Sequence, residues 1–305
     1  MNSKLSTVCC LLLTAAAATA GWYPPEAGQP GTTAISKDSP LFVNWANGHS
    51  NYSPGYSVEA VWQTPANAYG KPEGDIFTIA CLGNGGSITM VFPHPICDGP
   101  GADFAVFENS FSDYNLELAF VEVSSDGVNF VRFQVWSFTD EEVGAYAVAA
   151  MNPTDIEGFA GKYRAGFGTP FDLAALSASA TLDPQQIRFV RIVDIVGDGG
   201  TFDSLWQPIY DPTPTYGSGG FDLDGIGVIH QNAGPLQLAS AQITPQGFTL
   251  TWDSNPGSTY QIMESTDLKT WQLARTVPGN LTGTTTQTVM PMTGSPAKFW
   301  QVARP

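Results

Sequence analysis

Short apolar runs bounded by glycine, proline, asparagine or aspartate recur along the chain, and they restrict its fold more than any other feature. Such runs fit short β-strands, because the bounding residues favour the turns that reverse a chain. Before residue 231 they cover residues 75–81, 87–92, 103–107, 116–124, 130–137, 187–196 and 225–230. Apolar side chains fall on both faces of 116–124, which is typical of a strand inside a sandwich. The pattern predicts an all-β fold.

The character of the sequence changes at residues 231–235, which read QNAGP. Before this point we predict a large jelly-roll-like β-sandwich over residues 21–232, with short alanine-rich helical segments at 141–150 and 171–178. Beyond it, six further strands are predicted at residues 236–240, 248–252, 259–265, 271–277, 284–290 and 298–304. Their spacing predicts a small fibronectin-III/immunoglobulin-like β-sandwich over residues 236–305.

The first 20 residues, MNSKLSTVCCLLLTAAAATA, have the order of a secretory signal peptide. Lys4 precedes an uncharged apolar run, and Ala18-Thr19-Ala20 has the small side chains of a cleavage site. The run is shorter than the roughly 20 residues that span a membrane, and no later segment is apolar for long enough. A lipid anchor on Cys9 or Cys10 is the alternative, although no small residue precedes them. We therefore expect a secreted, extracellular or cell-surface protein.

Cleavage of this peptide leaves two cysteines, Cys81 and Cys97. An even pair in an exported protein favours a disulfide, here across a predicted hairpin. Such a bond closes a loop of about 16 residues and adds roughly 3 kcal/mol of stability. The alternative is a pair of buried free thiols.

The charge balance excludes several partners. The chain has 12 lysines and arginines against 28 aspartates and glutamates, a net charge of −16. Such a surface is a poor match for nucleic acid or anionic lipid. Carboxylate oxygens instead suit hard cations, of which calcium is the one we predict as a cofactor.

Acidic residues gather around a long glycine-rich segment, residues 197–220, that follows a predicted buried strand. Segments beyond about 15 residues without strands or helices are usually functional or disordered, and the aromatic residues of this one favour an ordered structure. The residues we predict as calcium ligands are Asp194, Asp198, Asp203, Asp222, Asp224 and Glu108. The pattern DxDxDG is incomplete, so the alternative is that these aspartates bond to turn amides.

Aromatic side chains in the same segment suggest a ligand surface. An aromatic face beside aspartate or asparagine can stack on a sugar ring and bond to its hydroxyl groups, although most aromatic residues of a sandwich fill its core. The ligand-binding residues predicted here are Trp206, Tyr210 and Tyr216.

Several motifs carry a resemblance to known proteins: GPGADFAVFENSF, ELAFVEVSSDGVNF, VRIVDIVGDGG and GSGGFDLDGIGVIH. With these, residues 30–231 resemble a family of uncharacterised secreted or cell-surface β-sandwich proteins of bacteria. The later motif TWDSNPGSTYQIMESTDLKTW resembles fibronectin-III-like modules that close many secreted bacterial proteins. The resemblance implies export and a sandwich fold. Related-looking surface proteins accompany nutrient capture systems, including corrinoid uptake.

Searches for catalytic patterns find little. His49, His94 and His230 lack the spacing of a zinc site, and there is no GxSxG or nucleotide-binding glycine pattern. Glu117 and Glu122 are an odd number of residues apart, so a regular strand sends them to opposite faces.

These observations predict a non-enzymatic, calcium-stabilised binding or adhesion protein whose partner is an extracellular glycan or another cell-surface component. One alternative is an extracellular polysaccharide hydrolase or lyase that uses Glu108 with an aspartate of the long segment. Another is a surface protein that captures a small nutrient such as a corrinoid.

Overall fold

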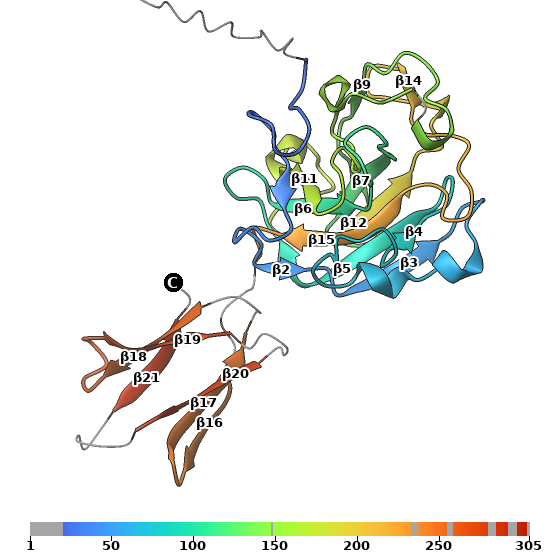
Figure 1. Cartoon of the computed structure of the whole chain (residues 1–305). Coiled ribbons are helices and arrows are strands. Elements are labelled where there is room, and N and C mark those ends of the chain that lie inside the picture. The colour runs from blue at the N-terminus through green and yellow to red at the C-terminus, as the bar shows by residue number, and fades with distance from the viewer. Residues whose placement is uncertain are drawn as a thin grey trace, which may run out of the picture.

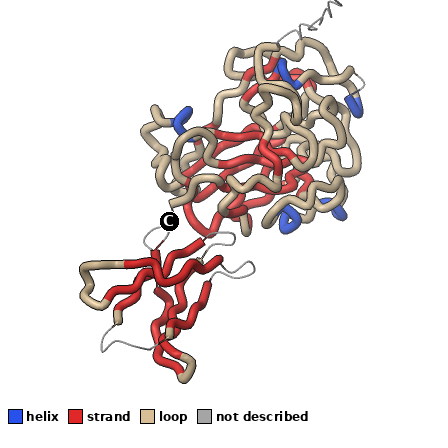
Figure 2. Tube along the Cα trace, turned by 60° about the vertical axis from the view of Figure 1, so that its left-hand side comes forward, coloured by secondary structure: helices blue, strands red, loops and turns tan. Residues whose placement is uncertain are grey.

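The computed structural model describes residues 21–147, 149–232, 236, 238–254, 259–279, 285–291 and 298–303. The predicted signal peptide, residues 1–20, lies outside the described residues. Strands dominate the described chain, and its helices are short (Figure 2). The prediction of an all-β fold is therefore confirmed. In the described residues no helix is long and apolar enough to cross a membrane.

Two antiparallel sheets form the larger part of the molecule (Figure 1). The first sheet contains, in spatial order, β1 (Ile35–Ser36), β11 (Phe167–Phe171), β6 (Phe104–Glu108), β15 (Asp222–Val228) and β2 (Asn44–Trp45), and β4 (Ala80–Cys81) also pairs with β15. The second contains β3 (Gly48–Ser53), β5 (Ser87–Ile96), β12 (Ile187–Asp194), β7 (Ala119–Ser124) and β8 (Val131–Arg132). The chain crosses from β5 to β6, back to β7 and later from β12 to β15, as in a jelly-roll-like sandwich.

Apolar side chains from both sheets share one core. Phe104 and Ile226 of the first sheet and Met90, Val121 and Val190 of the second are fully buried in the same cluster. Every residue of β6, β7 and β15 is buried, because these strands are covered on both faces. This core fixes the positions of the strand ends that carry acidic residues.

Smaller elements connect the strands. The long segment 197–220 contains a hairpin of β13 (Asp198–Phe202) and β14 (Pro208–Tyr210), and β9 (Trp136–Ser137) pairs with β10 (Ile156–Glu157). The helices of the described residues are single 3-10 turns: η1 (Ala60–Trp62), η2 (Pro65–Ala68), η3 (Ala145–Ala147), η4 (Pro153–Asp155) and η5 (Leu173–Leu176). The predicted helical segments 141–150 and 171–178 thus shorten to η3 and η5, since Phe171 ends β11.

The C-terminal strands pair only with one another in the described residues. One sheet has β16 (Leu238–Thr244), β17 (Gly247–Asp253) and β20 (Thr285–Met290), and the other has β19 (Gln272–Pro278), β18 (Thr259–Ser265) and β21 (Phe299–Ala303). They enclose a separate core that includes Trp252, Tyr260 and Ile262. Two three-stranded antiparallel sheets around one core agree with the predicted fibronectin-III/immunoglobulin-like sandwich.

The predicted disulfide is wrong, because Cys81 and Cys97 are free. Cys81 lies in β4, where its Sγ donates to the Gly219 carbonyl oxygen at 3.2 Å. Cys97 follows the far end of β5, Ser87–Ile96. A strand of that length spans about 30 Å, whereas a disulfide requires Cα atoms within about 7 Å. The expected hairpin instead continues as one long strand of the second sheet.

Candidate functional site

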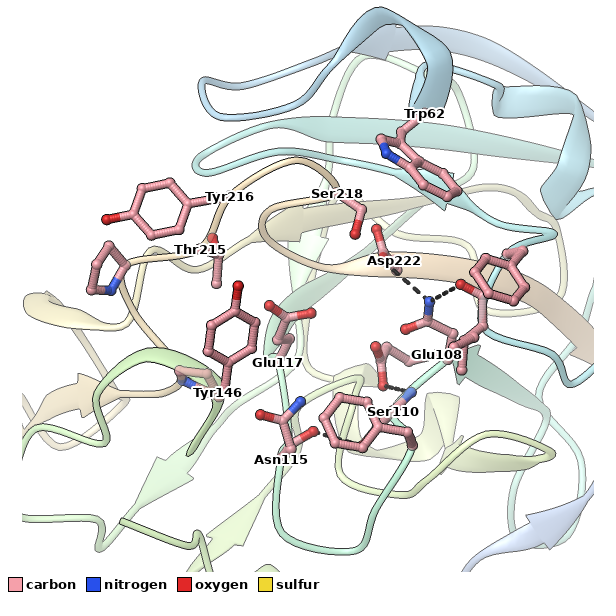
Figure 3. A pocket seen from close by; sticks show the side chains of 16 residues that line it. Trp62, Glu108, Ser110, Asn115, Glu117, Tyr146, Thr215, Tyr216, Ser218 and Asp222 are labelled. Atoms are coloured by element: carbon pink, nitrogen blue, oxygen red, sulfur yellow. Dashed lines mark hydrogen bonds between the residues drawn. The ribbon is translucent and has the colours of Figure 1, made fainter. Parts of the chain in front are cut away.

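A pocket of about 230 Å³ lies where β6 ends and β15 begins (Figure 3). The two strands are antiparallel, and Glu108 at the end of β6 pairs with Leu223 near the start of β15. This register places Glu108 close to Asp222. Figure 3 shows both side chains and that of Glu117 around the same space. The sandwich core therefore positions carboxyl groups from distant parts of the sequence together.

Glu108 is fully buried, and only one of its oxygens has a hydrogen-bond partner. Oε2 accepts a bond from the backbone amide of Ser110 at 2.7 Å. Oε1 is buried without a partner in the described chain. Burial raises the pKa of Glu108 well above its usual value, and the nearby Asp222 adds to the rise.

Asp222 has the same kind of surroundings. Its Oδ2 accepts a bond from the Asn109 side-chain amide at 3.1 Å, and that amide also donates to the Ile76 carbonyl oxygen. Oδ1 has no hydrogen-bond partner among the described residues. Burial raises the pKa of Asp222 to about 7.

Glu117 is the third carboxyl group of the pocket. The residue after Glu117 is held by two hydrogen bonds. The Leu118 amide donates to the Asp211 carboxylate, and the Leu118 carbonyl oxygen accepts from the Ile195 amide. No hydrogen bond from a described residue reaches the Glu117 carboxylate. Removal from bulk solvent raises its pKa well above the usual value, and the charge of Glu108 raises it further.

The charges of the pocket are one-sided. Among the described residues its lining includes Glu108, Glu117 and Asp222 but no lysine, arginine or histidine. The side-chain oxygen of Asn115, another acceptor, is also buried and has no partner in the part of the chain that the structure describes. Buried acceptor oxygens that lack partners among the described residues are stabilised by protons, a cation or a ligand that supplies donors. The pocket thus has the chemistry of a site for one of these.

Aromatic side chains form the rim. Trp62 lies on one side of the acids, and Tyr146 and Tyr216 lie on the other (Figure 3). Phe77 and Phe111 also line the pocket, and both are exposed. Exposed aromatic faces above an acidic floor combine an apolar platform with hydrogen-bond acceptors.

The other predicted calcium ligands lie outside the pocket, and their carboxylates accept hydrogen bonds from backbone amides. Asp194 accepts from the amides of Gly85 and Phe221, at 2.7 and 2.6 Å. Asp224 accepts from the Gly74 amide at 3.1 Å, although no described residue bonds to its Oδ1. Burial raises the pKa of Asp194 and that of Asp224 to about 7.

The remaining two predicted ligands shape the β13–β14 hairpin. Asp198 is exposed and accepts from the Gly200 amide at 2.8 Å. Asp203 is buried and accepts from the amides of Leu205, Gln207 and Ser137. Of the six predicted ligands, the structure therefore brings Glu108 and Asp222 together in the pocket and leaves the other four outside its lining.

A different acidic group could hold a metal ion. One carboxylate oxygen each from Asp98, Asp103 and Asp172 lies within 4.8 Å of the other two. Asp103 is fully buried and the other two are partly exposed. In the described chain no comparable group of three includes Glu108 or Asp222.

The predicted ligand-binding aromatics separate into two places. Tyr216 lines the pocket beside Thr215 and Ser218. Tyr210 lines another groove, and Trp206 projects from the turn next to that groove. The long segment 197–220 therefore contributes to two surfaces.

Neither Glu117 nor Asn115 was predicted as a site residue from the sequence. As a catalytic carboxylate Glu117 was paired only with Glu122, whose carboxylate instead pairs with Arg132 and Arg191. Glu117 lies before a buried strand, as an acid in a run of apolar residues, and that position is the signal that could have identified it.

Comparisons with known proteins identify no family. No protein-family model matches the chain, and no curated protein matches its sequence. One solved structure that it resembles weakly is a β-1,2-glucanase from Parabacteroides distasonis, with 11% sequence identity and a TM-score of 0.27. The match covers 82% of this chain and 34% of the glucanase, so this chain spans about a third of that enzyme's length.

Proposed function

We propose that this protein is an extracellular carbohydrate-binding protein and that the acidic pocket receives a sugar unit. The observation that carries the proposal is the set of unpartnered acceptors, Glu108 Oε1, Asp222 Oδ1 and Asn115 Oδ1, beneath an aromatic rim. A sugar ring has hydroxyl groups that can donate to the floor and C–H faces that can pack on aromatic rings. Its hydroxyl donors would satisfy these oxygens.

The size of the pocket supports a small or terminal unit. A volume of about 230 Å³ is below the roughly 300–1,000 Å³ of sites for drug-sized ligands. A corrinoid is far larger than one sugar ring, so this pocket gives the nutrient-capture alternative little support.

Glycan binding measured by calorimetry with the full chain tests the proposal. Wild-type protein should bind a neutral or amino sugar oligomer, and Glu117→Gln or Asp222→Asn should weaken binding at least about tenfold. Asp198→Asn is the matched control, because Asp198 is an exposed acid outside the pocket. Equal binding by all four proteins would remove the pocket from the proposal.

Glycoside hydrolysis is a second candidate. The observation that favours it is the raised pKa of Glu117 beside Asp222, whose pKa is about 7, because hydrolysis needs one protonated and one ionised carboxyl group. Release of reducing sugar that is lost in Glu117→Gln, with binding retained, would promote this function over simple binding.

We also propose that Asp98, Asp103 and Asp172 bind a calcium ion. Three carboxylates with converging oxygens suit a hard cation, and calcium accepts six to eight oxygen ligands at flexible geometry. Calcium at 100 times its Kd would stabilise the fold by about 2.7 kcal/mol. An unchanged melting temperature with calcium and with chelator would exclude this ion.

Export is also proposed, on the signal-peptide pattern of residues 1–20. N-terminal sequencing of protein recovered outside the producing cell should begin at Gly21. Protein retained inside the cell with its first 20 residues intact would contradict export.

A further inference from the structure

A groove of about 440 Å³ lies between the β9 region and the β13–β14 hairpin, away from the acidic pocket. Strands β9 and β14 lie side by side (Figure 1). We name this feature the aromatic groove; it is lined by Phe138, Leu205, Pro208 and Tyr210 together with the polar residues Ser137, Thr139, Asp140 and Gln207. None of these residues lines the acidic pocket.

Exposed aromatic pairs extend the lining on both sides. On one side Trp22 packs on Phe138 with ring centroids 5.8 Å apart, and Trp22 is 82% exposed. On the other side Phe202 packs on Trp206 at 6.2 Å, and Trp206 is also 82% exposed. Large aromatic surfaces left in solvent on both sides of one groove indicate a binding surface.

The turn that presents Trp206 is held in a strained conformation. Trp206 has a φ of +63°, in a region that bulky residues avoid. Buried Asp203 fixes the turn, since its carboxylate accepts from the amides of Leu205 and Gln207 and from Ser137 on the opposite side. Ser204 adds two bonds to Val135. Strain maintained by so many bonds around an exposed indole is characteristic of functional sites.

The chemistry of the lining selects the class of ligand. Asp140 is the only charged residue among those lining the groove, and the whole chain carries a net charge of −16. Anionic partners are therefore repelled. The side chains of Gln207, Thr139 and Ser137 offer donors and acceptors next to flat aromatic faces, which match the hydroxyl edges and C–H faces of sugar rings.

We propose that the aromatic groove is a second carbohydrate-binding surface, which holds an uncharged oligosaccharide against Phe138 and Tyr210 with Trp22 and Trp206 on either side. This surface goes beyond the proposed function, because it shares no side chain with the acidic pocket. Trp206 and Trp22 supply the stacking faces, and Gln207 bonds to ligand hydroxyl groups.

Calorimetric titration of the full chain tests this surface with five probes: the uncharged hexasaccharides of β-1,4-glucose, β-1,3-glucose, α-1,4-glucose, β-1,4-xylose and β-1,4-mannose. At least one should bind, and Trp206→Ala and Gln207→Ala should each lower its affinity about tenfold or more. Tyr56→Ala is the matched control, because Tyr56 is an exposed aromatic residue that lines neither surface. Its affinity should equal that of the wild type.

The outcomes separate this proposal from the first. If no probe binds, or if both groove variants bind as the wild type does, the aromatic groove is not a carbohydrate site. Binding that Glu117→Gln abolishes and Trp206→Ala leaves intact would overturn the groove and support the pocket. Binding that depends on Trp206 and not on Glu117 would support the groove and count against the pocket.

Discussion

Strand β6 has a buried acid at each end, and the surroundings of the two acids differ. Asp103, just before the strand, accepts bonds from the Gly99 amide, the Leu173 amide and His230 Nδ1, all between 2.7 and 2.8 Å. Glu108, at the other end, accepts one bond from Ser110, and its Oε1 has no partner within the described ranges. The first acid connects three chain segments and also belongs to the group proposed to hold calcium, whereas the second retains an acceptor oxygen with no partner among the described residues. Burial alone does not separate the two acids; the number of hydrogen bonds that each accepts does.

Replacement of the saturated acid should have the largest effect. Asp103→Ala leaves the buried Leu173 amide, the half-buried Gly99 amide and His230 without their acceptor, so the free energy of unfolding should fall by about 3–5 kcal/mol. Urea unfolding followed by tryptophan fluorescence measures the change. Glu108→Gln is the control at the other end of β6, and it should change stability by no more than about 1 kcal/mol. A larger loss in Glu108→Gln than in Asp103→Ala would reverse the comparison.

The pH dependence of stability should follow the unsaturated acids. Burial raises the pKa of Asp222 to about 7 from 3.8, so the folded state binds this proton more tightly than the unfolded state. Its contribution to stability is complete below about pH 4 and is lost as the pH rises through 7. From pH 5 to pH 8 the wild type should lose about 2–3 kcal/mol through Asp222.

Urea unfolding at pH 5, 6, 7 and 8 measures this loss, to which Asp194 and Asp224 contribute with the same sign. Asp222→Asn should have a shallower decline than the wild type. Stability that rises with pH over this range in the metal-free protein would contradict the assigned surroundings.

Removal of one pocket charge should have a smaller and opposite effect on stability. Glu117→Gln removes a carboxylate that lies near Glu108 and Asp222 and forms no hydrogen bond with a described residue. Less repulsion should raise the free energy of unfolding by about 1 kcal/mol at pH 8. Thermal unfolding of this variant and of Asp198→Asn at pH 8 measures the gain. A loss of stability would show that Glu117 has a structural partner.

The smallest expected effect concerns the strained turn. Trp206→Gly places a glycine where φ is +63°, so stability should rise by about 0.5–1 kcal/mol although a large side chain is lost. Calorimetric melting measures the gain, with Trp22→Gly as the exposed control that has no positive φ. A fall in stability for Trp206→Gly would mean that the indole supports the hairpin.

The positions of the strands could be predicted from the sequence more readily than the residues of the site. Alternating and continuous apolar runs identified β7, β12, β17 and β18 nearly to their ends, because strand periodicity is a local property. The crossing of the chain between sheets is not local. For that reason the hairpin expected between Cys81 and Cys97 was wrong, and β5 instead runs the length of the second sheet.

The acidic residues also show that local sequence patterns do not reveal contacts between distant segments. Glu108 and Asp222 were predicted to act together, and the antiparallel register of β6 and β15 brings them into one pocket. Which aspartates bond to distant amides depends on loop packing: Asp211 bonds to Leu118, and Asp203 to Ser137. No spacing in the sequence contains that information, so the predicted ligands could not be divided into bonded and free acids.

Segment 197–220 supplies walls to both surfaces, although the sandwich core does not depend on most of it. Its hairpin contributes Tyr210 to one surface, and the stretch that follows contributes Tyr216 to the other. Exchange of segment 197–220 between related chains would therefore change the lining of both surfaces at once while the sandwich core stays intact. Grafting this segment is accordingly a compact way to redesign the two proposed sites together.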